Sequence, residues 1–345
     1  MSGFSYGELF PTKLSLFIFI GYILLFVNQG LLVTGSQKSD NNYDYNTVTV
    51  VLFTEVIKLI ASCALYCKDS SAKSLVVDVV KNKNVLMLYF IPAILYCLYN
   101  NLSFINLSKF DPTTYFLLLQ LRVVITALLF QIIFKKKLSK TQWISLNLLM
   151  FGCMLKNINF GDNKEDNPGN KSDSVDLGLN TILILVQIIC SCLAGVYNEY
   201  LLKKEGADVN IFVQNVFMYL DSIICNVILL TITGSIAEGF TYDSISKVLH
   251  YKVLLVMCNN AAIGIVTSFF LKTLNSILKT FASALELGLT AVLSYIFFNI
   301  PIYMNTVCSL AIVMYAIYLY SRNPVSNVPK VTVSVEKQEL LAEEV

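Results

Sequence analysis

One arginine within an apolar stretch is the first residue of this sequence that suggests chemistry. The run from Tyr115 to Phe134 is about as long as the hydrocarbon core of a bilayer is thick, and it contains Arg122. An arginine at that depth costs at least ~2.5 kcal/mol unless it faces a polar cavity or a partner. Two interpretations follow: a buried site that binds phosphate, or an ion pair between packed helices with Glu55 or Glu286.

A second cation stands at the start of a later apolar run. Lys272 and Lys279 bracket a short turn, and Lys279 opens the run that follows it. The free backbone N–H groups at a helix N-terminus already attract anions, and a lysine there strengthens that attraction. Arg122 and Lys279 together would suit a diphosphate, because a guanidinium can also hold two oxygens at once.

Two further pairs of polar residues have helical spacing. Glu55 and Lys58 are three residues apart and can pair on one helix face. This pair would either neutralise itself within a packed bundle or contact a substrate. Asn215 and Tyr219 are four apart, so an amide and a phenol share one face. They suit a sugar or a base, or alternatively hydrogen bonds between helices.

The composition indicates an integral membrane protein. The chain has 345 residues, of which 56% are hydrophobic and 14% charged, too few charges to cover a water-exposed surface of this size. The net charge of +2 and the lack of a long basic tract argue against nucleic-acid binding. The nine cysteines lie in or beside apolar segments without CxxC spacing, so we expect neither disulfides nor a metal site. No cofactor is predicted.

Ten apolar spans are long enough to cross a membrane, which predicts an all-α membrane protein with ten transmembrane helices. They cover roughly residues 14–34, 46–66, 85–106, 113–134, 141–157, 178–201, 211–232, 251–272, 276–299 and 302–320.

The spans form an internal repeat. The segment 121–129, LRVVITALL, aligns with 285–293, LELGLTAVL, and the pair Asn100-Asn101 aligns with Asn259-Asn260. The fourth span therefore matches the ninth, and the third matches the eighth. Because each unit has five crossings, an odd number, the second copy has the opposite orientation in the membrane. The sequence thus predicts two inverted five-helix repeats, an architecture of alternating-access transporters.

The basic residues predict cytosolic termini. Sixteen of the 25 lysines and arginines fall on the side of the two termini, seven fall on the opposite side, and Lys58 and Arg122 lie within the membrane. Asn170, in an Asn-Lys-Ser glycosylation triplet, then lies in a non-cytosolic loop over 158–177.

The motifs together resemble those of a nucleotide-sugar transporter. The segments that carry the resemblance are TEVIKL (54–59), NNLSF (100–104), Tyr115 with QLR (120–122), LSKTQW (138–143), AGVYNE (194–199), QNVFMYL (214–220) and NSILKTF (275–281). The chain is similar over residues 11–325 to the drug/metabolite transporter superfamily, in the group that includes the CMP-sialic acid and UDP-galactose carriers.

This resemblance implies a fold, an activity and residue roles. It implies ten helices around a central cavity and strict exchange of a luminal nucleoside monophosphate for a cytosolic nucleotide sugar across the Golgi membrane. Arg122 and Lys279 would contact phosphate, and Asn215 and Tyr219 match an NxxMY motif. Four further residues fall at cavity-facing matches: Asn101, Tyr115, Ser191 and Tyr197.

The expected cargo is UDP-galactose, imported against UMP. Relatives often have tyrosine where this chain has Leu119, and glycine where it has Thr280, so another UDP-sugar such as UDP-N-acetylglucosamine is the alternative.

The expected domains are a transporter domain over 1–325 and a disordered cytosolic tail over 326–345. Within the first, one repeat covers about 12–157, a luminal loop 158–177, and the other repeat 178–322. Glu336, Leu340 and Leu341 fit an acidic dileucine pattern for a cytosolic adaptor. The sequence does not decide whether the chain forms a homodimer.

The sequence argues against two other classes of protein. An intramembrane enzyme would need a cluster of acid–base residues, yet the chain has a single histidine, His250, and neither G-x-S-x-G nor H-E-x-x-H. A non-transporting scaffold or adaptor would have lost its cavity charges, but Arg122 and Lys279 are present.

Overall fold

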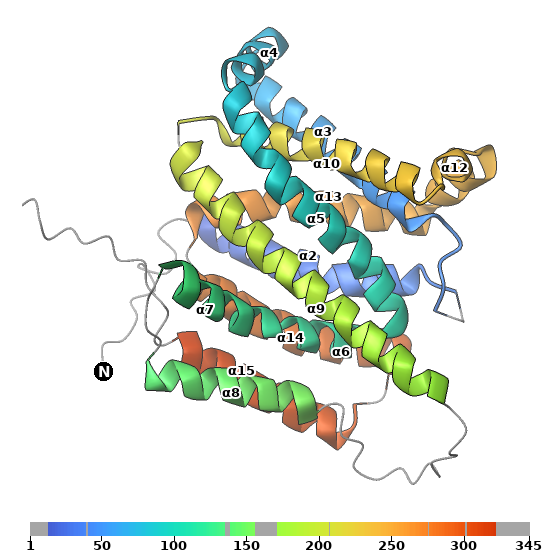
Figure 1. The fold of residues 1–345 in the computed structure, drawn as a ribbon, viewed down its shortest axis with the longest axis vertical. Coiled ribbons are helices and arrows are strands. Elements are labelled where there is room, and N and C mark those ends of the chain that lie inside the picture. The colour runs from blue at the N-terminus through green and yellow to red at the C-terminus, as the bar shows by residue number, and fades with distance from the viewer. Residues whose placement is uncertain are drawn as a thin grey trace, which may run out of the picture.

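The chain folds into a bundle of helices. The computed structural model describes residues 13–38, 41–134, 139–155, 171–206, 208–274, 276–300 and 302–321. Asn170, the 326–345 tail and its dileucine pattern lie outside these residues. Every regular element within them is a helix, and none is a strand, as predicted for an all-α protein (Figure 1).

Eleven longer and three shorter α-helices make up the described bundle. The longer ones are α2 (Lys13–Gly35), α3 (Thr47–Asp69), α4 (Ala72–Lys81), α5 (Lys83–Lys109), α7 (Leu121–Phe134), α8 (Lys140–Leu155), α9 (Lys171–Tyr200), α10 (Ile211–Ile232), α13 (Tyr251–Thr273), α14 (Ser276–Phe298) and α15 (Met304–Ser321). The shorter ones are α6 (Pro112–Leu119), α11 (Ile236–Gly239) and α12 (Tyr242–Val248). A π-helix, Leu201–Glu205, follows α9.

Polar residues mark where these helices begin. Asn46 accepts a hydrogen bond from the backbone N–H of Thr49 at the start of α3, and Asn210 caps α10 in the same way. Asp111 caps α6, and Pro112 takes the first helical position, where its missing N–H costs nothing. The cap residues therefore fix the boundaries that the apolar runs only suggest.

The predicted span 113–134 is two helices, α6 and α7, that meet at Gln120. The backbone N–H of Gln120 bonds to the carbonyls of Leu117 and Leu118, which tightens the turn. The Gln120 side chain also donates to the carbonyl of Phe116. This turn lies two residues before Arg122 and sets where its side chain emerges.

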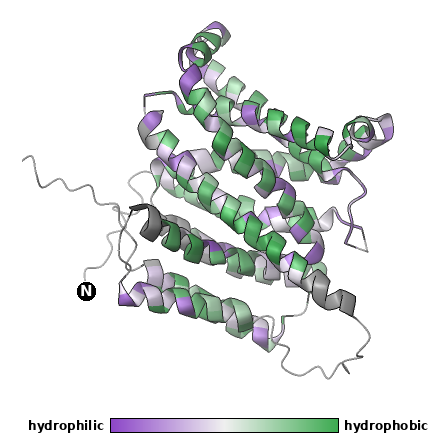
Figure 2. Cartoon of the chain, viewed as in Figure 1, coloured by the Kyte–Doolittle hydropathy of each residue, from purple (hydrophilic) through white to green (hydrophobic). Residues whose placement is uncertain are grey.

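Other boundaries also differ from the prediction. The predicted loop 158–177 overlaps α9, which begins at Lys171, and α4, α11 and α12 were not expected. Seven helical segments are long and apolar enough to cross a membrane by length and composition: 13–35, 47–69, 83–109, 112–129, 178–200, 211–232 and 251–273. The described parts of α14 and α15 are apolar but shorter, so the ten crossings stay a prediction. Figure 2 shows the helices as largely hydrophobic along their lengths.

Helices distant in the sequence pack side by side. α3 packs against α10, α5 against α9, α2 against α13, and α8 against α15 (Figure 1). Small residues allow close contact: a Cβ added at Gly152 in α8 would lie 2.7 Å from Val313 Cγ2 in α15.

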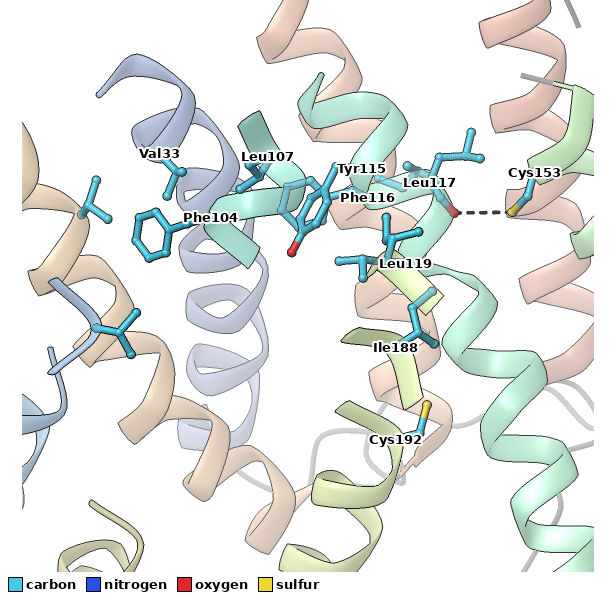
Figure 3. Packing of buried hydrophobic residues seen from close by; sticks show 14 of the residues in the cluster. Val33, Phe104, Leu107, Tyr115, Phe116, Leu117, Leu119, Cys153, Ile188 and Cys192 are labelled. Carbon is cyan, nitrogen blue, oxygen red and sulfur yellow. Dashed lines mark hydrogen bonds between the residues drawn. The ribbon is translucent and has the colours of Figure 1, made fainter. Parts of the chain in front are cut away.

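The largest apolar cluster joins α6 to its neighbours. Phe116 and Leu117 are fully buried within it, and Cys153 Sγ of α8 donates to the Leu117 carbonyl over 3.4 Å (Figure 3). This packing anchors the helix that leads to Gln120 and Arg122.

Candidate functional site

A cavity of about 280 Å³ lies inside the bundle and is lined by residues of most of the long helices. Its volume is near the lower end of the range of small-molecule sites, ~300–1,000 Å³. Its lining mixes aromatic rings with amides, hydroxyls and charged groups. The structure brings six of the predicted site residues together there: Glu55, Lys58, Arg122, Ser191, Asn215 and Tyr219.

Polar stripes on individual helices build this lining. On α3, Thr54, Glu55 and Lys58 lie along one face. On α5 the stripe consists of Tyr96, Tyr99, Asn100 and Ser103, at positions i, i+3, i+4 and i+7. Because these helices are otherwise apolar, burying the stripes against one another places polar groups on the wall of an interior cavity.

Glu55 and Lys58 form a buried ion pair that also contacts two other helices. Lys58 Nζ lies 2.8 Å from Glu55 Oε1, and Asn100 Nδ2 of α5 donates to the same oxygen over 3.2 Å. The ammonium lies 5.6 Å from the centroid of the Tyr219 ring of α10, within the range of a cation–π contact. The pair therefore joins α3 to α5 and α10 on the cavity wall.

The side-chain amide of Asn215 forms a hydrogen bond through its oxygen but not through its nitrogen among the described residues. Its Oδ1 accepts a hydrogen bond of 2.7 Å from Ser268 Oγ of α13. Its Nδ2 is buried and has no hydrogen-bond partner among the described residues. Asn260 Oδ1 and Thr267 Oγ1, also on the lining, have none there either. A buried donor and acceptors without partners are costly in an empty site, so they point to a polar ligand.

Arg122 has two contacts on α14. Its Nη2 donates to Ser283 Oγ over 2.6 Å and lies 3.6 Å from Glu286 Oε2. The ion pair proposed from the sequence is therefore present, with Glu286 and not Glu55 as its partner. Arg122 also lines the cavity. The two interpretations of Arg122, an ion pair and a ligand site, are thus compatible.

Three predicted residues do not line the cavity. Asn101 Nδ2 donates to Asn226 Oδ1 of α10 and to the Cys97 carbonyl. Tyr115 is buried outside the lining, and the ring of Tyr197 lies 6.1 Å from that of Tyr200. The side chain of Lys279, in the first turn of α14, lies outside the described residues.

Tyr115 belongs to a hydrogen-bond network that meets the cavity wall at Ser103. Its hydroxyl donates to Ser103 Oγ over 3.1 Å and accepts from Gln187 Nε2 of α9 over 2.7 Å. Gln187 Oε1 in turn accepts from Asn106 Nδ2 over 2.6 Å. The hydroxyl therefore joins α6 to α5 and α9. Figure 3 shows the Tyr115 side chain beside Phe116.

Sequence reasoning missed most of the α5 stripe and the serines of the second half. Tyr96, Tyr99 and Asn100 could have been found from their helical period. Ser268 and Ser283 are single hydroxyls in apolar runs. Only their hydrogen bonds with Asn215 and Arg122 identify them as part of the site.

A bundle of apolar helices around a cavity with polar groups on its wall, including charged residues of α3, α7 and α9, defines a multi-pass membrane protein built to hold a polar solute. Comparison with known proteins agrees. Residues 12–321 match the family model described as nucleotide-sugar transporter, so the chain belongs to the nucleotide-sugar transporter family. Members of this family are transporters and not enzymes, as predicted.

Two relatives and one solved structure show the range of similarity. The chain is 56% identical over 376 residues to the UDP-galactose transporter senju of Drosophila melanogaster, covering 99% of this chain and 97% of that protein. It is 29% identical to CMP-sialic acid transporter 1 of Oryza sativa subsp. japonica, covering 85% and 89%. A crystal structure at 12% identity matches with a TM-score of 0.55, covering 88% of this chain and 95% of that one, and so supports the fold alone.

Proposed function

We propose that this protein imports UDP-galactose into the Golgi lumen in exchange for UMP, by alternating access. The choice of UDP-galactose as substrate is supported by the 56% identity, over almost the whole chain, to a protein named as a UDP-galactose transporter. The cytosolic placement of both termini rests on the distribution of lysine and arginine.

The cavity chemistry supports a nucleotide sugar. Arg122 offers a guanidinium on the cavity wall, suited to two phosphate oxygens. Asn215 Nδ2 offers a free donor, and Tyr219 an aromatic face beside it on α10. We propose Lys279, in the first turn of α14, as the second phosphate ligand.

The helix pairings support two related halves. If α2, α3, α5, α7 and α8 correspond in order to α9, α10, α13, α14 and α15, the pairings map onto one another. α5 packs on α9 as α13 packs on α2, and α7 packs on α9 as α14 packs on α2. α3 and α8 pack on their own equivalents, α10 and α15. Inverted repeats related in this way would let the two halves rock around a central site.

Leu119, where relatives often have tyrosine, gives no reason to prefer another substrate. Leu119 is buried in the largest apolar cluster and does not line the cavity. The side chain of Thr280, the other departure, lies outside the described residues.

Purified protein in liposomes tests the proposal. Vesicles preloaded with UMP are offered labelled UDP-galactose, UDP-N-acetylglucosamine or CMP-sialic acid. We expect UDP-galactose to enter fastest and preloaded UMP to accelerate its entry. Preferred entry of UDP-N-acetylglucosamine would support nucleotide-sugar transport but replace UDP-galactose as the assigned substrate. No entry of any nucleotide sugar would refute transport and favour a scaffold.

A further inference from the structure

An ion pair links the two halves of the bundle at matched positions. Arg122 is the second residue of the segment 121–129, and Glu286 is the second residue of the aligned segment 285–293. One repeat thus supplies the cation and the other the carboxylate, with Arg122 Nη2 and Glu286 Oε2 3.6 Å apart.

The two partners differ in how they meet the cavity. The Arg122 side chain is 16% exposed and lines the cavity, whereas the Glu286 side chain is 1% exposed and does not. The guanidinium therefore lies between the solute and the carboxylate. A ligand in the cavity can reach Arg122 directly, and Arg122 in turn pairs with Glu286.

Glu286 attracts Arg122 without occupying its donors. A separation of 3.6 Å exceeds the ~2.7–2.9 Å of a charge-assisted hydrogen bond. The hydrogen bond to Ser283 also uses Nη2, and among the described residues the guanidinium donates to no other side chain. The N–H groups on Nε and Nη1 are thus available to phosphate oxygens.

Among the described residues, both cations on the cavity wall, Lys58 and Arg122, have a carboxylate partner. Lys58 has its counter-charge in Glu55, one turn earlier on the same helix. Arg122 has its counter-charge on α14, in the other half of the chain. Without Glu286, the empty cavity would hold a buried guanidinium lacking this neutralising group, which is strongly unfavourable in a low-dielectric interior.

We infer that Glu286 takes the place of the substrate phosphate as the counter-charge of Arg122 when the carrier is empty. This inference rests on the proposed exchange of uridine nucleotides. A loaded carrier needs the carboxylate less, because phosphate neutralises the guanidinium. An empty carrier with Glu286 can pass through the closed state between its two openings without an isolated charge. On this inference the exchange of UMP for UDP-galactose is faster than uncoupled movement but not obligatory, unlike the strict exchange that the family resemblance implies.

The test compares two modes of efflux in the same vesicles. Liposomes containing the full chain are loaded with labelled UMP and diluted into buffer that either lacks substrate or contains unlabelled UMP. We expect the wild-type protein to release UMP in both buffers, faster with external UMP. In Glu286→Gln, efflux into empty buffer should fall at least about tenfold, equivalent to about 1.4 kcal/mol of barrier, while exchange stays within about threefold.

Two variants control for general damage. Glu286→Asp keeps the charge and should retain uncoupled efflux. Asp221→Asn removes another buried carboxylate, on α10, which does not line the cavity, and should leave the ratio of the two rates unchanged.

The outcomes separate this inference from the proposed function. Exchange without any uncoupled efflux in the wild-type protein overturns the inference alone, whether or not the variants insert. So does a Glu286→Gln protein whose uncoupled efflux, relative to exchange, equals or exceeds that of wild type. If the wild-type protein moves no nucleotide in either buffer, the proposed function fails, and the inference fails with it.

Discussion

The ammonium of Lys58 on α3 lies 5.6 Å from the centroid of the Tyr219 ring on α10. The same ammonium lies 2.8 Å from Glu55 Oε1, so a cation is held between a carboxylate and an aromatic face. Both contacts lie on the cavity wall. The sequence alone leaves the role of the Glu55–Lys58 pair open between packing and substrate binding.

Lys58→Met is expected to destabilise the protein by about 3–5 kcal/mol, because it leaves Glu55 buried without its cation. Thermal unfolding in detergent measures this, and the double variant Glu55→Gln/Lys58→Met should recover most of the loss. We expect uptake to remain low in the double variant, since both groups line the cavity. Full recovery of uptake would assign the pair to packing alone.

Arg122→Ala is expected to reduce UDP-galactose uptake at least about a hundredfold without preventing membrane insertion, because a buried charge-assisted contact is worth ~2–5 kcal/mol. The variant also leaves Glu286 without its cation. The control is therefore Arg122→Gln/Glu286→Gln, which should fold as well as wild type and still fail to transport. Normal uptake by either protein would remove Arg122 from the site.

Asn215→Asp keeps the acceptor that Ser268 uses and removes the buried donor Nδ2. We expect KM for UDP-galactose to rise about tenfold, with kcat less affected, because the lost donor faces the ligand in our proposal. Asn226→Asp is the matched control: this buried amide on the same helix does not line the cavity. An unchanged KM in Asn215→Asp would contradict the assignment.

Gly264→Ala places a methyl group where there is little room. Its Cβ would lie 2.8 Å from Lys58 Cε and 3.2 Å from the Tyr219 hydroxyl. Both side chains must shift, so we expect uptake to fall several-fold while the melting temperature changes little. Gly21→Ala on α2, whose Cβ would meet nothing within 4 Å, should transport as wild type does. Equal uptake in the two variants would show that the cavity tolerates this shift.

The helices were predictable because their apolar runs are long. α10 has the predicted bounds, 211–232, and α13 differs by a single residue at one end. α4 was missed because its ten residues mix charges with valines, too short and too polar for a span. The break at Gln120 depends on hydrogen bonds within one turn, which periodicity does not reveal.

The site was only partly predictable, for reasons of geometry. The resemblance predicts Asn101 on the cavity wall, but its neighbour Asn100 lines the cavity instead. Adjacent residues point about 100° apart around a helix, so only one of the two can face it. Tyr115 suggested a ligand contact, but its partner Gln187 lies on a helix distant in the sequence. The sequence offers Glu55 and Glu286 as partners for Arg122, and only the contact between Arg122 and Glu286 in space selects the second.

The contact between Arg122 and Glu286 also constrains how the protein is made. Arg122 of α7 is synthesised well before α14, so during insertion the ribosome-bound chain carries a charged residue whose partner, Glu286, has not yet been translated. Newly made helices must therefore stay loosely associated, or in contact with water, until the ninth predicted span arrives. A chain ending after Thr273 should be degraded quickly in a pulse–chase experiment, and Arg122→Leu should lengthen the lifetime of that fragment.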